Sequence, residues 1–96
     1  MKHYVDLKFR PEVFAESLLI EVESTLGQAK EVIPGFQRYE LLRVKDWSVD
    51  NPEVLLVLEF SDNESLKTYI AHNLHLQLLK TVKPHLAGKA IFDGLI

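Results

Sequence analysis

The sequence contains no cysteine, and this absence excludes disulfide bonds, thiolate metal sites and cysteine nucleophiles together. It also lacks any apolar run approaching the roughly 20 residues that a membrane-spanning helix needs. No apolar segment follows Met1-Lys2-His3-Tyr4, so the start of the chain does not look like an export signal. A cytoplasmic location is therefore the default expectation.

An excess of basic residues is missing as well. The chain carries 11 Lys and Arg against 14 Asp and Glu, a formal net charge of −3. Such a chain repels phosphate backbones unless its basic residues cluster. The densest basic stretch, Lys80, Lys83, His85 and Lys89, is interrupted by Pro84 and apolar residues and is typical of a solvated helix face. We expect neither nucleic acid nor a membrane as a partner.

What the sequence does contain is the composition of one globular domain. It has 96 residues, of which 47% are hydrophobic and 26% charged, and we expect a single domain over residues 1–96. A domain of this size leaves much of its surface exposed, so an apolar face is readily buried against a second copy. The expected partner is the protein itself, as a homodimer.

Two periodic segments open the chain. Residues 3–10 alternate, with His3, Val5 and Leu7 on one face, which predicts a half-buried strand. Apolar residues then recur at helical spacing over residues 12–33. This helix must end near Pro34-Gly35, because proline disfavours helical geometry in the residue before it.

The remaining segments complete a known order of elements. Residues 36–45 read as a second strand, and residues 54–60 as a third strand that is apolar on both faces. Ser61 and Glu64 can form a capping box for a helix over residues 62–72, continued or restarted over 74–82. Residues 87–95 read as the last strand. The resulting β-α-β-β-α-β order predicts an α+β, ferredoxin-like fold with helices on one face of an antiparallel sheet.

The chain resembles the stress-responsive α/β-barrel family, the Dabb domains. The resemblance rests on the opening strand 3–9, the helix stop at 33–35, Phe60-Ser61, the segment 69–75 and the late Phe92-Asp93. It covers nearly the whole chain. Asn73 stands where the family usually has proline, and Pro52-Glu53 where many members have glycine and tyrosine.

The resemblance implies a dimeric α/β barrel. A few members are similar to polyketide cyclases that use a tyrosine and a histidine in a cleft between sheet and helices. Those residues would be Tyr69 and His75 here, with His3 nearby. Val22 and Leu26 stand where a cyclase would offer aromatic walls, so the resemblance does not imply an aromatic pocket.

Tyr69, His72 and His75 lie three residues apart, so on a continuous helix they point to roughly one side. Histidine can act as an acid or a base near neutral pH, and tyrosine can donate a hydrogen bond to an enolate oxygen. In a catalytic interpretation His75 removes a proton from carbon and Tyr69 stabilises the oxyanion. In a structural interpretation the histidines tether a helix bend and Tyr69 packs in the core.

Two further interpretations are weaker. His72, His75 and His3 could hold a metal ion, but no carboxylate stands at a supporting position in the motif. A monooxygenase usually requires a haem or an activated aromatic substrate, and the sequence offers no candidate haem ligand other than the histidines. We expect neither a metal nor a cofactor.

The sequence therefore predicts a homodimeric Dabb-like protein with a small-molecule cleft, and it leaves open whether the protein is an enzyme. The alternative to a non-catalytic protein is a cofactor-free cyclase or isomerase acting on a small ketone or a polyketide-like compound. Its candidate catalytic residues are His75 and Tyr69. The expected ligand-binding residues are His3, Val5, Leu7, Leu56, His72 and Leu78.

Overall fold

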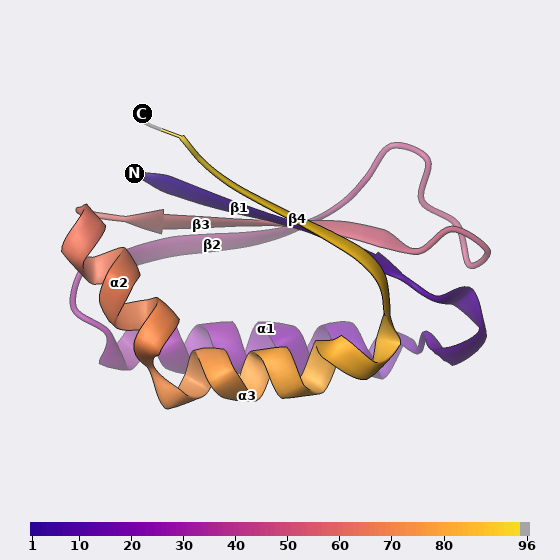
Figure 1. Cartoon of the computed structure of the whole chain (residues 1–96), viewed down its shortest axis with the longest axis horizontal. Helices are drawn as coiled ribbons and strands as arrows, with labels where there is room; N and C mark the ends of the chain where they lie inside the picture. The colour runs from indigo at the N-terminus through magenta and orange to yellow at the C-terminus, as the bar shows by residue number, and fades with distance from the viewer. Residues whose placement is uncertain (95–96) are drawn as a thin grey trace.

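A four-stranded sheet packs against one layer of helices in the computed structural model, which describes residues 1–94 (Figure 1). The strands are β1 (Lys2–Phe9), β2 (Phe36–Arg43), β3 (Glu53–Phe60) and β4 (Leu86–Gly94). The helices are α1 (Glu16–Val32), α2 (Asn63–Ala71) and α3 (Asn73–Val82), with 3-10 turns η1 (Pro11–Val13) and η2 (Lys83–His85). The strand order is β2-β3-β1-β4 and every pair is antiparallel. The predicted ferredoxin-like α+β fold is confirmed.

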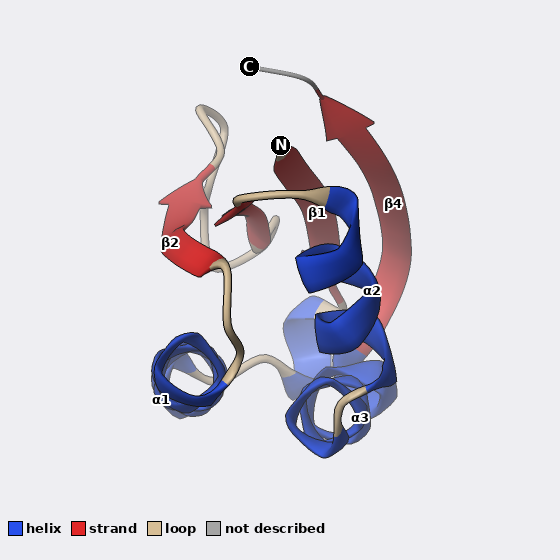
Figure 2. Cartoon of the chain, turned by 90° about the vertical axis from the view of Figure 1, so that its left-hand side faces the viewer, coloured by secondary structure: helices blue, strands red, loops and turns tan. Residues whose placement is uncertain are grey.

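All the helices lie on one face of the sheet, and its other face is bare (Figure 2). The core between the layers is apolar, and its strand residues alternate as the sequence predicts. On β3, Val54, Leu56, Leu58 and Phe60 are buried, while the residues between them are only half-buried. The second apolar face of β3 thus belongs to the bare side of the sheet. None of the helices in residues 1–94 is both long and apolar enough to cross a membrane.

The first helix begins later than the sequence predicts. Pro11 starts a separate 3-10 turn, and Phe14 and Ala15 are extended, so α1 starts at Glu16 rather than near Glu12. At its other end α1 stops at Val32, as the Pro34-Gly35 pair requires. The last strand starts at Leu86, and Leu95, which the sequence places in it, lies outside the described residues.

The cap of α2 is also one residue away from its predicted position. The Asp62 carboxylate, not the Ser61 hydroxyl, accepts the backbone N–H of Ser65, at 2.8 Å. Both residue types cap helices well, and an ionised carboxylate interacts more strongly with the positive end of the helix dipole. Hydrogen bonds from the backbone and side chain of Ser65 lower the pKa of Asp62.

Candidate functional site

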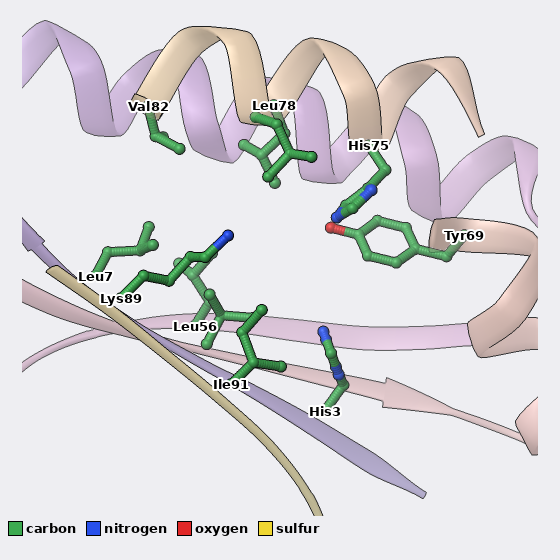
Figure 3. Close-up of a pocket in the computed structure, with 11 residues that line it drawn as sticks. His3, Leu7, Leu56, Tyr69, His75, Leu78, Val82, Lys89 and Ile91 are labelled. Carbon is green, nitrogen blue, oxygen red and sulfur yellow. The ribbon is translucent and has the colours of Figure 1, made fainter. Parts of the chain in front are cut away.

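A cavity of about 100 Å³ lies between α3 and the helix-facing side of the sheet (Figure 3). β1, β3 and β4 form its floor, α3 forms its roof, and α2 closes one end. Most of its wall is aliphatic, and the polar side chains are three aromatic rings and one lysine. The lining residues are His3, Val5, Leu7, Leu56, Tyr69, His75, Leu78, Leu79, Val82, Lys89 and Ile91.

Tyr69 reaches the cavity from α2. Its ring is buried and packs against the rings of Phe36 and Phe60, with centroid distances of 5.5 and 5.4 Å. Burial raises the pKa of the phenol, so the hydroxyl stays protonated. Figure 3 shows this hydroxyl at the end of the cavity where His75 lies. Tyr69 therefore combines a fixed ring with a hydrogen-bond donor directed at the ligand space.

His75 lies on the first turn of α3, and its ring centroid is 4.8 Å from that of Tyr69. Its Nδ1 lies 2.9 Å from the carbonyl oxygen of Ile70. A carbonyl only accepts, so Nδ1 carries the proton and Nε2 has a free lone pair. Burial lowers the pKa of His75, and electrostatic interactions with His3 and Lys89 act in the same direction, against the Ile70 hydrogen bond. The ring is therefore neutral and basic near neutral pH.

His3 enters the cavity from the floor. Its Nδ1 lies 2.6 Å from Oδ1 of Asp93, directly across the β1–β4 pair, and His3 is buried. An ionised carboxylate accepts this hydrogen bond, so His3 Nδ1 donates and its Nε2 is the free nitrogen. The ring lies edge-on to Tyr69 at 6.5 Å. Two imidazoles, each with a hydrogen bond at Nδ1, thus lie beside the same tyrosine ring.

His72 has a different position from the other two histidines. It lies at the break between α2 and α3, and its Nδ1 accepts the backbone N–H of Leu74 at 3.0 Å, which makes it the cap of α3. It does not line the cavity. The expected ligand-binding residues His3, Val5, Leu7, Leu56 and Leu78 do line it, as do Tyr69 and His75.

Four lining residues were not among the expected site residues: Leu79, Val82, Lys89 and Ile91. Leu79 and Val82 belong to the inward stripe of α3. Every second residue of β4 lies on the same face, and Lys89, Ile91 and Asp93 share the face that is turned to the helices. Lys89 pairs with Leu7 of β1, and Ile91 pairs with Val5. Aligning the last strand against the first would have placed both on the cavity floor.

The described residues contain no group of three or more His, Asp or Glu side chains arranged to hold a metal ion. Val22 and Leu26, which stand where a cyclase would offer aromatic walls, are fully buried in the core under α1. They do not line the cavity. The chemical resources of the site are therefore two imidazoles, a phenol and an ammonium group in an aliphatic enclosure.

Solved structures share this fold over the full chain at low sequence identity. A ferredoxin-like protein of unknown function from Thermobifida fusca, described as dimeric, has a TM-score of 0.76 at 16% identity, over 99% of this chain and 90% of that one. A candidate antibiotic biosynthesis monooxygenase from Bacteroides thetaiotaomicron has a TM-score of 0.82 at 14% identity, over 100% and 88%. A dimeric protein of unknown function from Bacteroides fragilis has a TM-score of 0.73 at 23% identity, over 99% and 94%. At these identities the likeness establishes the fold alone.

No curated protein sequence matches this chain. The model of the stress responsive A/B barrel domain, Dabb, matches residues 1–94, which include every strand, every helix and the whole lining of the cavity. The protein therefore belongs to the Dabb family of stress responsive A/B barrel domains.

Proposed function

We propose that the cavity is an active site for proton transfer at a carbon next to a carbonyl group, and that the protein acts as a cofactor-free isomerase or cyclase on a small ketone. The observation that carries this proposal is the pair formed by the His75 and Tyr69 rings, 4.8 Å apart. One member is a neutral base and the other a protonated donor, and both face an aliphatic space.

In this proposal each group has its own step. His75 Nε2 accepts the proton from the α-carbon, the C–H bond breaks, and its electron pair moves to the carbonyl oxygen as an enolate. The Tyr69 hydroxyl donates a hydrogen bond to that oxygen, and the low polarity of the cavity strengthens this interaction. Return of the proton to a different atom completes an isomerisation. Attack of the enolate carbon on a second carbonyl of the same molecule forms the ring, and the resulting alkoxide takes the proton back from His75.

His3 holds the ligand in this scheme. Its Nδ1 is bonded to Asp93, so Nε2 is fixed toward the cavity and accepts a hydrogen bond from a hydroxyl group of the ligand. The aliphatic residues Val5, Leu7, Leu56 and Leu78 contact the carbon skeleton. The cavity therefore supports orientation as well as chemistry.

The cavity size favours a small ketone over a polyketide-like compound. Its volume of about 100 Å³ is below the roughly 300–1,000 Å³ of sites for drug-sized ligands. It is closer to an engineered cavity of about 150 Å³ that accepts benzene. Molecules of about that size are the appropriate probes.

The test is exchange of carbon-bound hydrogen for deuterium in butanone and cyclopentanone, followed by NMR in deuterated water. The protein should accelerate exchange, and His75→Ala and Tyr69→Phe should each reduce the acceleration by about 100-fold or more. Tyr69→Phe keeps the packing of the ring, so its loss would report the hydroxyl. Binding of the ketones without exchange would identify a non-catalytic binding protein and reject the enzyme.

We also infer that the bare face of the sheet pairs with a second copy to form a barrel between subunits. Tyr4 and Phe92 stack across β1 and β4 at 5.0 Å on this face, and Val57 lies on the other side of Tyr4. Phe92 and Leu42 are 53% and 43% exposed in the single chain. Exposed apolar residues gathered on one face are typical of an interface.

Sedimentation of the wild type and of Phe92→Asp tests this assembly. The wild type should sediment as a dimer and the variant as a folded monomer. Ile20→Asp is the matched control, because Ile20 is 69% exposed on α1, on the helical side of the molecule. A monomeric wild type, or a dimer that only Ile20→Asp disrupts, would reject the interface.

A further inference from the structure

Lys89 provides the one lysine or arginine side chain that lines the cavity within residues 1–94. It lies on β4 opposite Leu7 of β1, and on the same face of β4 as Ile91 and Asp93. Figure 3 shows its side chain rising from β4 toward α3, with the nitrogen in the space between sheet and helix. The Tyr69–His75 pair lies toward the other end of the cavity in the same view. The cavity therefore has a cationic end and a hydrogen-bonding end, separated by aliphatic residues.

No neighbouring carboxylate neutralises this cation. The ion pairs among residues 1–94 are His3–Asp93, Arg38–Glu40, Arg43–Glu16 and Lys67–Glu64, and none includes Lys89. No Asp or Glu lines the cavity, and Asp93 is bonded to His3. The charge of Lys89 also reaches the other end, since it contributes to keeping His75 neutral. The lining of the cavity thus includes one lysine and no carboxylate.

We propose that the natural ligand is a small keto acid, whose carboxylate binds the Lys89 ammonium while its ketone lies at Tyr69 and His75. A carboxylate forms charge-assisted hydrogen bonds with an ammonium group, and a single lysine matches its single negative charge. The distance between the two ends of the cavity can be estimated along β4. The backbone positions of Lys89 and of Asp93, which holds His3, are separated by about 13 Å, at roughly 3.3 Å per residue. The long side chain carries the ammonium group of Lys89 into the cavity, so this group lies nearer to His3 and His75 than the Lys89 backbone does.

The position of the ketone in this inference rests on the proposed proton-transfer function, whereas the carboxylate contact does not. A lysine on an edge strand can also simply lay its aliphatic stem on apolar neighbours and keep its ammonium in water. That arrangement would give no preference for an anion. The difference between an acid and its amide therefore isolates the role of the charge.

The experiment compares levulinate with levulinamide, which has the same skeleton and ketone but no charge. Binding is followed through the backbone amide and histidine ring signals of the full chain by NMR. The wild type should bind levulinate about tenfold more tightly than levulinamide, as expected for one charge-assisted hydrogen bond. In Lys89→Met the preference for levulinate over levulinamide should be lost. Lys80→Met, on the exposed side of α3, should retain the wild-type preference.

Equal affinities of the two probes for the wild type would overturn the proposal. An unchanged preference in Lys89→Met, or no binding of levulinate at millimolar concentration, would do the same. Deuterium exchange into bound levulinate is read separately. A Lys89-dependent preference without exchange would reject the proton-transfer function and leave the carboxylate site standing. Exchange into neutral ketones, without a preference for the acid, would reject the carboxylate site and leave the proton-transfer function standing.

Discussion

The rings of Tyr69 and His75 lie 4.8 Å apart even though a helix ends and another begins between them. On a continuous helix of 3.6 residues per turn, a spacing of six residues would turn the two side chains about 120° away from each other. The chain instead turns at His72, whose backbone is extended. The pair is therefore held by the tertiary structure, with Tyr69 fixed in the core and His75 fixed by the Ile70 carbonyl.

Substitution of the two neighbouring histidines by asparagine separates chemistry from folding. His72→Asn should preserve deuterium exchange and stability, because asparagine is itself a good N-cap. His75→Asn should reduce exchange by about 100-fold or more, since asparagine cannot accept the proton. Exchange kinetics and thermal unfolding of both variants check this. Equal losses of exchange in the two variants would point to a structural role for both histidines.

The lowered pKa of His75 predicts a specific pH dependence. The NMR titration of its ring should have a midpoint below the ordinary value of 6.5, because burial disfavours the imidazolium. The rate of exchange should stay high down to that midpoint and fall below it. The free energy of unfolding changes in the same direction. The contribution of neutral His75 is present above the pKa that His75 has in the unfolded chain, and it is lost as the pH falls through the pKa in the folded protein. A midpoint at or above 6.5 would contradict the assignment.

Removal of the Asp93 carboxylate should destabilise the fold through His3. In Asp93→Ala the buried Nδ1 of His3 loses its partner, and such a loss costs about 1–3 kcal/mol in free energy of unfolding. Urea denaturation measures this cost. Asp50→Ala, in the exposed loop before β3, is the control and should leave the midpoint unchanged. If Asp93→Ala matched this control, the His3 hydrogen bond would contribute no stability.

Gly35 should not tolerate alanine. Its φ of +86° lies in the left-handed region, and an added Cβ would lie 2.6 Å from Ser61 Oγ and 2.7 Å from Ser65 Cβ. We expect Gly35→Ala to lower the free energy of unfolding by more than about 1 kcal/mol. Gly88→Ala is the matched control, because a Cβ at Gly88 meets nothing within 4 Å. Similar melting temperatures for the two variants would show that the turn adapts.

A pair of carboxyl groups on the bare face predicts an opposite pH effect. The neighbouring Asp6 carboxyl, burial and the charge of Asp46 raise the pKa of Glu53, against the attraction of Lys8. The stability gained from protonating Glu53 is present below its unfolded pKa and is lost as the pH rises through the folded one. Glu53→Gln should therefore stabilise the protein at neutral pH by about 0.5 kcal/mol and have no effect in acid. Paired urea titrations check this. Glu12→Gln, in an exposed turn, should show no such pH-dependent difference.

The sequence allowed the layers and the order of the elements along the chain to be predicted, because their patterns are strong. The alternation in β1 and the helical stripe of α1 each have a clear period. The exact cap of α2 could not be chosen, since Ser61 and Asp62 are adjacent and both cap helices. The direction of His72 was left open, because the sequence supported both a place in the cavity and a tether at the helix bend. Its place in the spacing suggested the cavity, but the break after α2 made it a cap.

The contribution of β4 was the hardest to predict. Its residues are mostly exposed, and its small side chains Ala87, Gly88 and Ala90 weaken the alternation. Only the register with β1 shows that Lys89 and Ile91 reach the cavity. Paired strands distant in sequence carry this information, and no local pattern supplies it.

The hydrogen bond between His3 and Asp93 joins residues 90 positions apart. The helices α2 and α3, which carry Tyr69 and His75, are adjacent in sequence, whereas the floor beneath them requires closure of the longest loop in the described chain. Docking of β4 on β1 is therefore expected among the late events of folding. A bound ligand would bridge the two, so it should slow amide hydrogen exchange in the last strand more than in the helices.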